Sequence, residues 1–333
     1  MGSEPGDETD DIARPAAPAG SQTGVSMTCR GSYPARVATP QTGIFALGTM
    51  SHAWLELDGC PGIDPRDLVS TVASLREPRT TIGGVNLVAG FRPELWASVA
   101  PDAAPAGLRG FNESLVGRDG YTMPATQHDV VVWLSGAAYD VVFDVSRGIV
   151  SALTDRATLA LEIVGWPYHR DRDLTGFEDG LENPSLAEAS KVIAIDPSSP
   201  GEGGSVLLLQ QWEHDSTKWE ALPIDEQERA MGRTKLTGVE LDPRPETSHV
   251  GSTDQDRFGK IFRRNIGYGM LGRHGTIFVG FSRDRDRLEA MLRSMAGIGG
   301  GPRDQLTSFT QPLTGAYYFI PSSEALAAFE APG

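Results

Sequence analysis

The sequence predicts an α+β protein made of two ferredoxin-like units in tandem, each with an antiparallel sheet. The first half of the chain gives this prediction, because its strands and helices follow the order β-α-β-β-α-β. The second half repeats that order more loosely, as a repeat of elements and not of residues. With 333 residues, 39% of them hydrophobic, the chain is long enough for two domains, which we place at residues 39–174 and 175–325.

Residues 1–38 are rich in proline, glycine, alanine, serine and acidic side chains. Such a segment has too little apolar surface to offset the entropy lost on ordering, so we predict a disordered N-terminal arm. The arm begins MGSEPGDETDD, which lacks the apolar stretch of a secretory signal. The two cysteines, Cys29 and Cys60, form no CxxC pair and no disulfide framework. We therefore expect a cytoplasmic protein.

In the first domain, apolar runs of strand length alternate with stretches of helical spacing. Asp64-Pro65 offers a good N-cap and first helical residue, and apolar side chains follow at helical intervals. A longer loop rich in proline and glycine is expected between residues 91 and 128. The predicted strands are 51–58, 85–91, 128–136 and 157–166, and a second helix is predicted at 138–153.

The second domain offers similar elements, separated by a long polar segment. A strand at 204–215 precedes a short helix at 225–231, and a further strand follows at 275–282. A final strand is predicted at 315–322. The helix before it carries apolar side chains at i, i+3, i+4 and i+7, namely Leu288, Met291, Leu292 and Met295.

Several functional classes lose support from the sequence. The net charge of −15 argues against a nucleic-acid partner, which needs a basic surface. The most apolar run, at residues 130–134, is too short to cross a membrane. No P-loop, GxSxG or HExxH motif is present, and the six histidines are scattered without zinc-ligand spacing.

Three segments of the second domain stand out, namely GFEDGLENPS at 176–185, ETSHV at 246–250 and KIFRRNIGYG at 260–269. Together they resemble the dye-decolourising peroxidases, a family of haem enzymes built from two ferredoxin-like units. The family motif is G-x-x-D-G followed by an Asn-Pro turn, and this chain matches both parts. Further segments in family order, from PQTGIFALGT to YFIPS, extend the resemblance over roughly residues 40–322. The chain is most similar in type to the shorter bacterial, cytoplasmic members.

The resemblance implies a haem pocket in the C-terminal unit, holding non-covalent haem b. It assigns His249 as the axial ligand of the iron, and histidine is a common ligand in peroxidases. From spacing alone, a surface histidine in a polar loop is the simpler interpretation of His249, because most lone histidines are not ligands. His214, in the segment WEHD, is the competing candidate, although its place at a strand end suits a packing role better.

The resemblance assigns the distal side of the haem to Asp179, Arg263 and Asn265. Peroxide activation needs a group that moves a proton and positive charge near the departing oxygen. On an extended segment, alternate residues share a face, so Arg263 and Asn265 would point one way and Arg264 the other, where a propionate contact is its alternative role. Taken alone, Asp179 is also compatible with an ordinary Asp-Gly turn. The glycines beside it, including Gly180, would let the backbone approach the porphyrin closely.

By resemblance, Asp304 accepts a hydrogen bond from the second ring nitrogen of His249, as carboxylates behind ligand histidines often do. A helix N-cap is the alternative role for this residue. Trp212, Trp219 and Tyr317 are possible carriers of radicals to the surface, but core packing explains each of them more simply.

The resemblance therefore implies a haem-dependent peroxidase. It would reduce H2O2 and oxidise bulky organic reductants, such as dyes and phenols, in one-electron steps, and it would form a homo-oligomer, a dimer or larger. The alternative is a protein that binds or transfers haem or another porphyrin with little peroxidase turnover. Such a carrier has no need of Asp179 and Arg263, which distinguishes the two hypotheses.

Overall fold

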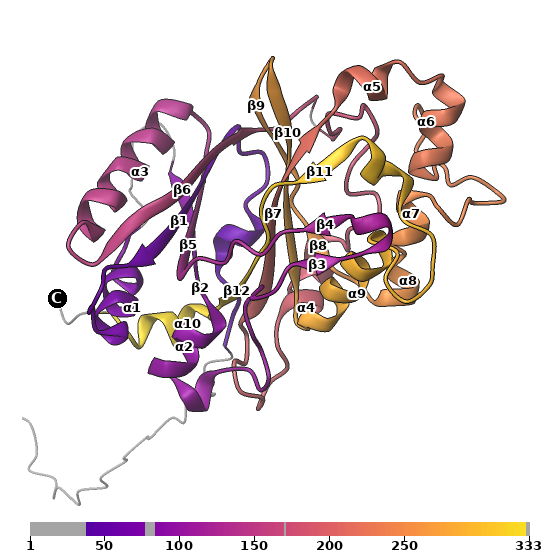
Figure 1. Cartoon of the computed structure of the whole chain (residues 1–333). Helices are drawn as coiled ribbons and strands as arrows, with labels where there is room; N and C mark the ends of the chain where they lie inside the picture. The colour runs from indigo at the N-terminus through magenta and orange to yellow at the C-terminus, as the bar shows by residue number, and fades with distance from the viewer. Residues whose placement is uncertain (1–37, 77–83, 170, 331–333) are drawn as a thin grey trace, which may run out of the picture. The chain divides into compact units, whose positions relative to one another are not determined.

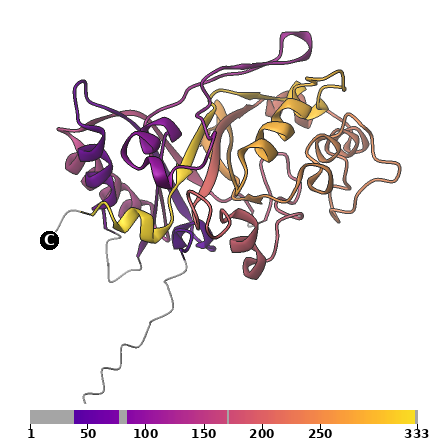
Figure 2. The same ribbon diagram turned by 90° about the horizontal axis from the view of Figure 1, so that it is seen from below.

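The computed structural model describes residues 38–76, 84–169 and 171–330 (Figures 1 and 2). The predicted disordered arm lies, except for residue 38, outside the described residues.

The first half of the chain contains the predicted strands and helices. Asp64 caps the first helix, because its side chain accepts a hydrogen bond of 2.8 Å from the backbone N–H of Arg66. The elements are a 3₁₀ turn (Thr42–Phe45), β1 (Ser51–Gly59), α1 (Pro65–Ala73), β2 (Val85–Phe91), β5 (Val130–Gly136), α3 (Tyr139–Leu153) and β6 (Ala157–Trp166).

The segment between β2 and β5 is more ordered than a proline- and glycine-rich loop. Pro93 lies at the start of a helix, where its fixed φ and missing N–H are tolerated. The expectation of a plain loop was therefore wrong. The segment contains α2 (Pro93–Val99), 3₁₀ turns at Pro101–Ala103 and Arg118–Gly120, and the short strands β3 (Leu115–Val116) and β4 (Thr122–Met123).

The second half contains the predicted strands and helices together with shorter elements. It begins with α4 (Leu186–Ile193), β7 (Ser205–His214), α5 (Ser216–Glu220) and α6 (Ile224–Met231). It continues with α7 (His249–Ser252), α8 (Gln255–Phe258), β8 (Phe262–Arg263), β9 (Ile266–Met270) and β10 (Arg273–Ser282). It ends with α9 (Arg285–Met295), a 3₁₀ turn (Gln305–Ser308), β11 (Thr310–Pro312), β12 (Ala316–Ile320) and α10 (Ser323–Ala327).

The strands of the two halves join in one antiparallel sheet that closes on itself. Around the ring the order is β7-β12-β2-β5-β1-β6-β9-β10, and β10 pairs back onto β7. The halves meet where β12 pairs with β2 and where β6 pairs with β9. The expectation of two separate sheets is corrected here. These contacts join residues more than a hundred positions apart, so no local pattern signals them.

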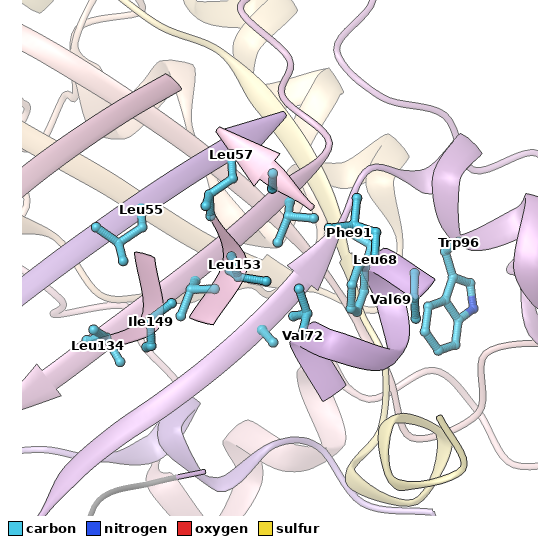
Figure 3. Close-up of a cluster of buried hydrophobic side chains, with 14 of the residues drawn as sticks. Leu55, Leu57, Leu68, Val69, Val72, Phe91, Trp96, Leu134, Ile149 and Leu153 are labelled. Atoms are coloured by element: carbon cyan, nitrogen blue, oxygen red, sulfur yellow. The ribbon is translucent and has the colours of Figure 1, made fainter. Parts of the chain in front are cut away.

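Apolar side chains fill both the inside of this ring and its outer surface. The inner cluster draws on both halves and includes Trp54, Trp133, Leu207, Phe281 and Tyr318, all almost fully buried. On the outer surface of the first half, α1 and α3 pack against the strands through residues such as Leu68, Ile149 and Leu153 (Figure 3).

The outer surface of the second half is covered by α9, as the apolar period in the sequence predicts. Leu288, Met291, Leu292 and Met295 face the strands, where they meet side chains such as Leu208 and Trp212. A space remains between α9 and the strands, and the candidate site lies in this space.

Candidate active site

A pocket lies between the outer surface of the second-half strands and the helices that cover it. Its walls come from β7, β10, α7, α9 and the loop that carries the motif at residues 176–185, here called the motif loop. Its volume is about 1200 Å³ with the space at its open mouth included. Apolar side chains form much of the wall, among them Leu208, Trp212, Phe278, Met291, Leu292 and Met295.

His249 enters the pocket from the start of α7. Ser248 caps this short helix by accepting a hydrogen bond from the N–H of Gly251. Nδ1 of His249 donates a hydrogen bond of 2.7 Å to Oδ2 of Asp304, whose side chain is fully buried. The other carboxylate oxygen of Asp304 accepts from the N–H of Leu306 at 2.9 Å. Asp304 is therefore both a cap and a histidine partner, so the two alternatives are compatible.

This hydrogen bond decides which nitrogen of His249 is available. Burial lowers the pKa of His249, but the charge and hydrogen bond of Asp304 raise it by more, so the net shift is upward. Because Nδ1 holds its proton toward Asp304, Nε2 is the nitrogen left for the pocket. In the described part of the chain, Nε2 has no hydrogen-bond partner.

Asp179, Arg263 and Asn265 meet at another part of the pocket wall. Nδ2 of Asn265 donates a hydrogen bond of 3.1 Å to Oδ1 of Asp179, and Nη1 of Arg263 lies 3.9 Å from the same oxygen. Their loops need glycine, because Gly176 and Gly180 have φ values of 84° and 78°. A carboxylate is thus held between an amide and a guanidinium, facing the pocket.

Arg264 lies on the opposite face of the same segment, as the alternation predicts. Its two Nη atoms donate to the carbonyl oxygens of Ile44 and Ala46 at 2.9 and 2.7 Å. Its guanidinium lies over the ring of Trp133, inside the closed sheet. Arg264 is therefore not part of the pocket.

Several polar atoms in the pocket wall are buried without a hydrogen-bond partner in the described residues. They are Nε of Arg263, Oδ1 of Asn265, both amide atoms of Gln210 and Oγ1 of Thr276. Buried polar groups are almost always paired in folded proteins. Their concentration in one pocket fits a site that receives a ligand with polar or charged groups.

Asn183, from the Asn-Pro of the motif, joins the motif loop to Arg263. Its Nδ2 donates to the carbonyl oxygen of Arg263, and its Oδ1 accepts from the N–H of Arg263, both at 2.9 Å. The side chain pairs with the backbone as a neighbouring strand would. No separate role was expected for Asn183, although its place in the motif was a usable signal.

Two further pocket residues escaped the sequence analysis. Asp173 is half-buried, and this burial together with the charge of Asp179 raises its pKa to about 6. Arg233 lines the pocket and pairs with Glu182 at 2.6 Å and with Glu240 at 2.7 Å. Neither residue has a local sequence pattern that marks it.

The remaining candidates take less direct positions. Gly180 lies at the turn of the motif loop beside Asn183, outside the pocket wall. His214 does line the pocket, and burial together with nearby His274 lowers its pKa to about 4. Its environment therefore keeps the ring neutral, but among the residues that the structure describes no carboxylate orients it as Asp304 orients His249.

The three aromatic residues considered as radical carriers are all buried. Trp212 lines the pocket, and Trp219 donates from its ring nitrogen to the carbonyl oxygen of Thr175 at 3.0 Å. Tyr317 packs against Phe111 with 5.3 Å between ring centroids. Core packing accounts for all three.

Among the residues that the structure describes, no helix combines the length and apolar character needed to cross a membrane.

Comparison with known proteins places this arrangement in a family. Residues 170–325 match the family model for the C-terminal part of Dyp-type peroxidases. A dye-decolorizing peroxidase from Mycobacterium tuberculosis is 34% identical over 252 residues, which cover 73% of this chain and 75% of the relative. A dye-decolorizing peroxidase from Rhodococcus erythropolis is 31% identical over 273 residues, covering 78% and 80%.

A solved structure agrees with these sequence matches. A variant of DypB from Rhodococcus jostii RHA1, in complex with haem, is 32% identical. It aligns with a TM-score of 0.77, covering 89% of this chain and 98% of DypB. Because these relatives are 31–34% identical to the chain over most of both proteins, the chain belongs to the dye-decolourising peroxidase family.

Proposed function

We propose that the pocket binds non-covalent haem b through His249 and that the protein reduces H2O2 with electrons from bulky organic reductants such as dyes and phenols. One observation carries the proposal. The same pocket presents a histidine backed by a buried carboxylate and, separately, a carboxylate held by an amide and a guanidinium. The first pair, His249 with Asp304, suits a metal ligand and the carboxylate that orients it. The second group suits proton transfer by Asp179 beside the positive charge of Arg263.

The residues fit the cofactor. Nε2 of His249 would ligate the iron, and the apolar wall from β7, β10 and α9 would cover the porphyrin faces. Arg233 would face the propionates, since it is a half-buried cation in the wall. The unpaired polar atoms near Arg263 and Asn265 suit small oxygen-containing ligands beside the haem.

When bound, the haem supplies the redox centre at which the O–O bond of H2O2 breaks and to which reductants return electrons singly. The chain supplies proton transfer and charge. Asp179 takes a proton from one peroxide oxygen and delivers it to the departing oxygen. Arg263 places positive charge where negative charge develops. Asn265 holds Oδ1 of Asp179 in place through its amide hydrogen bond.

For the organisation of the chain, we propose two ferredoxin-like domains, at residues 39–174 and 175–325, with the haem site in the second. Equal strand orders support this division, since β6-β1-β5-β2 in the first half corresponds to β12-β7-β10-β9 in the second. A cytoplasmic homo-oligomer, a dimer or larger, is proposed from the resemblance, and light scattering of the purified protein tests the oligomeric state.

The test is a titration of the haem-loaded protein with H2O2. The Soret absorption should change within seconds after one equivalent of peroxide, and a dye added next should be oxidised. Both responses should be strongly slowed in Arg263→Ala, while haem binding is kept. In His249→Ala, the haem should no longer be held with its native spectrum.

The carrier alternative gives a different pattern. Haem would bind through His249, but peroxide would leave the spectrum unchanged, and the Arg263 substitution would have no consequence. Failure to bind haem at all would contradict both functions.

A further inference from the structure

A short hairpin from the first half of the chain contacts the end of α9 in the second half. It consists of β3, the turn at Arg118–Gly120 and β4, and it forms a two-stranded sheet of its own. Its Met123 is fully buried, and Leu115 and Tyr121 pack into the same cluster as the apolar side chains of α9. Figure 1 shows the hairpin crossing in front of α9.

The tightest contact joins Gly117 of the hairpin to Ala296, directly after α9. A Cβ added to Gly117 would overlap the carbonyl oxygen of Ala296, and it would lie 2.7 Å from the Cβ of Ala296. The neighbouring N–H of Arg118 donates to that carbonyl oxygen at 2.8 Å. The φ of Gly117 is −102°, so the constraint is on space and not on backbone conformation.

Asp304 is attached to the same end of α9 by a backbone hydrogen bond. The N–H of Asp304 donates to the carbonyl oxygen of Met295 at 3.0 Å, one residue before the carbonyl that the hairpin holds. The loop between these points is held as well, because Nη1 of Arg118 donates to the carbonyl oxygen of Gly301 at 3.1 Å. The guanidinium of Arg303 lies 5.1 Å from the ring centroid of Tyr121.

We infer that the β3–β4 hairpin is a positioning element for the Asp304 carboxylate, and through it for the His249 imidazole. Asp304 is held at three points, because its N–H donates to the carbonyl oxygen of Met295 and its carboxylate accepts hydrogen bonds from Leu306 and His249. A displacement of the α9 end is therefore passed to the 2.7 Å hydrogen bond between Asp304 and His249. A carboxylate behind a ligand histidine sets how strongly the imidazole donates to a metal.

The inference rests on the proposed haem site, and its test is spectroscopic. The iron–histidine stretching frequency of the ferrous, haem-loaded protein is measured by resonance Raman spectroscopy. Asp304→Asn sets the reference, because it weakens the hydrogen bond directly and should lower the frequency. Gly117→Ala should shift the frequency in the same direction by a smaller amount. Arg118→Ala, which removes only the contact with Gly301, should give a smaller shift still.

Two controls separate positioning from loss of stability. Val116→Ala changes an exposed side chain of the same hairpin and should leave the frequency unchanged. Gly90→Ala introduces a Cβ that overlaps the Ile320 side chain, away from α9, and should lower stability without a frequency shift. In the apoprotein, amide hydrogen exchange at residues 297–307 should rise in Gly117→Ala but not in Gly90→Ala.

The outcomes are distinct. If Asp304→Asn shifts the frequency while Gly117→Ala and Arg118→Ala do not, the hairpin is structural only and the inference is overturned. The same holds if Gly90→Ala shifts the frequency as much as Gly117→Ala. If Asp304→Asn itself leaves the frequency unchanged, the carboxylate does not act on the histidine and the inference is overturned, while the proposed function stands. If the protein does not bind haem through His249, the proposed function fails first.

Discussion

Arg263 and Arg264 are adjacent in sequence, yet they lie in two different environments. Arg263 faces the pocket, near Asp179, and its buried Nε has no hydrogen-bond partner among the described residues. Arg264 faces the inside of the closed sheet, where two backbone carbonyls and the Trp133 ring surround it, and burial lowers its pKa to about 10. Arg264 has its hydrogen bonds satisfied by backbone carbonyls, so it stabilises the fold. Arg263 keeps a donor that can bind a ligand in the pocket.

The largest expected effect separates these two arginines directly. Arg263→Ala should lower kcat/KM for H2O2 by about 10²–10³-fold, the usual loss when one stabilising donor is removed, with little change in unfolding. Arg264→Ala should lower the free energy of unfolding by about 1–3 kcal/mol, because the Ile44 and Ala46 carbonyls lose their donors. Steady-state kinetics and chemical denaturation of both variants measure this. Equal kinetic losses in the two variants would remove the distinction.

A pH experiment tests a second ionisable group that is buried in the closed sheet, Glu56. Burial raises the pKa of Glu56 from 4.5 to about 7, although its hydrogen bond with Tyr318 opposes the shift. The folded protein therefore holds this proton more tightly than the unfolded chain, so the free energy of unfolding falls as pH rises from 4.5 to 7. The decrease due to this group is roughly 3 kcal/mol.

The matched variant for this prediction is Glu56→Gln, which keeps the shape and removes the titration. The difference in unfolding free energy between wild type and variant should change by roughly 3 kcal/mol over that pH range. Burial lowers the pKa of His52 to about 4, which acts in the opposite sense, so only the difference isolates Glu56. Parallel pH profiles for the two proteins would show that Glu56 does not titrate in this range.

A smaller effect is expected where Asn183 of the motif loop pairs with the backbone of Arg263 in β8. Asn183→Ala removes both hydrogen bonds to the Arg263 backbone and should lower kcat/KM for H2O2 by roughly 10–100-fold through misplacement of the guanidinium. Asn183→Asp keeps the acceptor for the N–H of Arg263 and should recover part of the loss. If the alanine variant is as active as wild type, Arg263 is positioned without Asn183.

The smallest effect is expected at Glu178, an exposed carboxylate in the same motif. Glu178→Gln should leave kcat/KM for H2O2 unchanged and alter the free energy of unfolding by no more than about 0.5 kcal/mol, as for most surface positions. A large kinetic loss here would move the proton-transfer role away from Asp179.

Local patterns predicted much of this structure, and long-range pairing set the rest. Alternation along an extended segment placed Arg263 and Asn265 on one face, and the Asp64-Pro65 pair marked a helix start. Nothing local could show that β10 returns to β7, or that β6 meets β9. Asp173 and Arg233 were missed for the same reason, since only the folded chain brings them to the pocket.

The closed sheet also bears on solubility. In the described part of the chain, the strands added outside the ring are β8 and β11, of two and three residues, so the ring offers little free strand edge to another chain. Either half expressed alone would open long edges, β2 and β6 in one case and β9 and β12 in the other. Each half covers the strand edges of the other and so prevents edge-to-edge aggregation. Expression of the two halves from separate genes should therefore yield insoluble fragments.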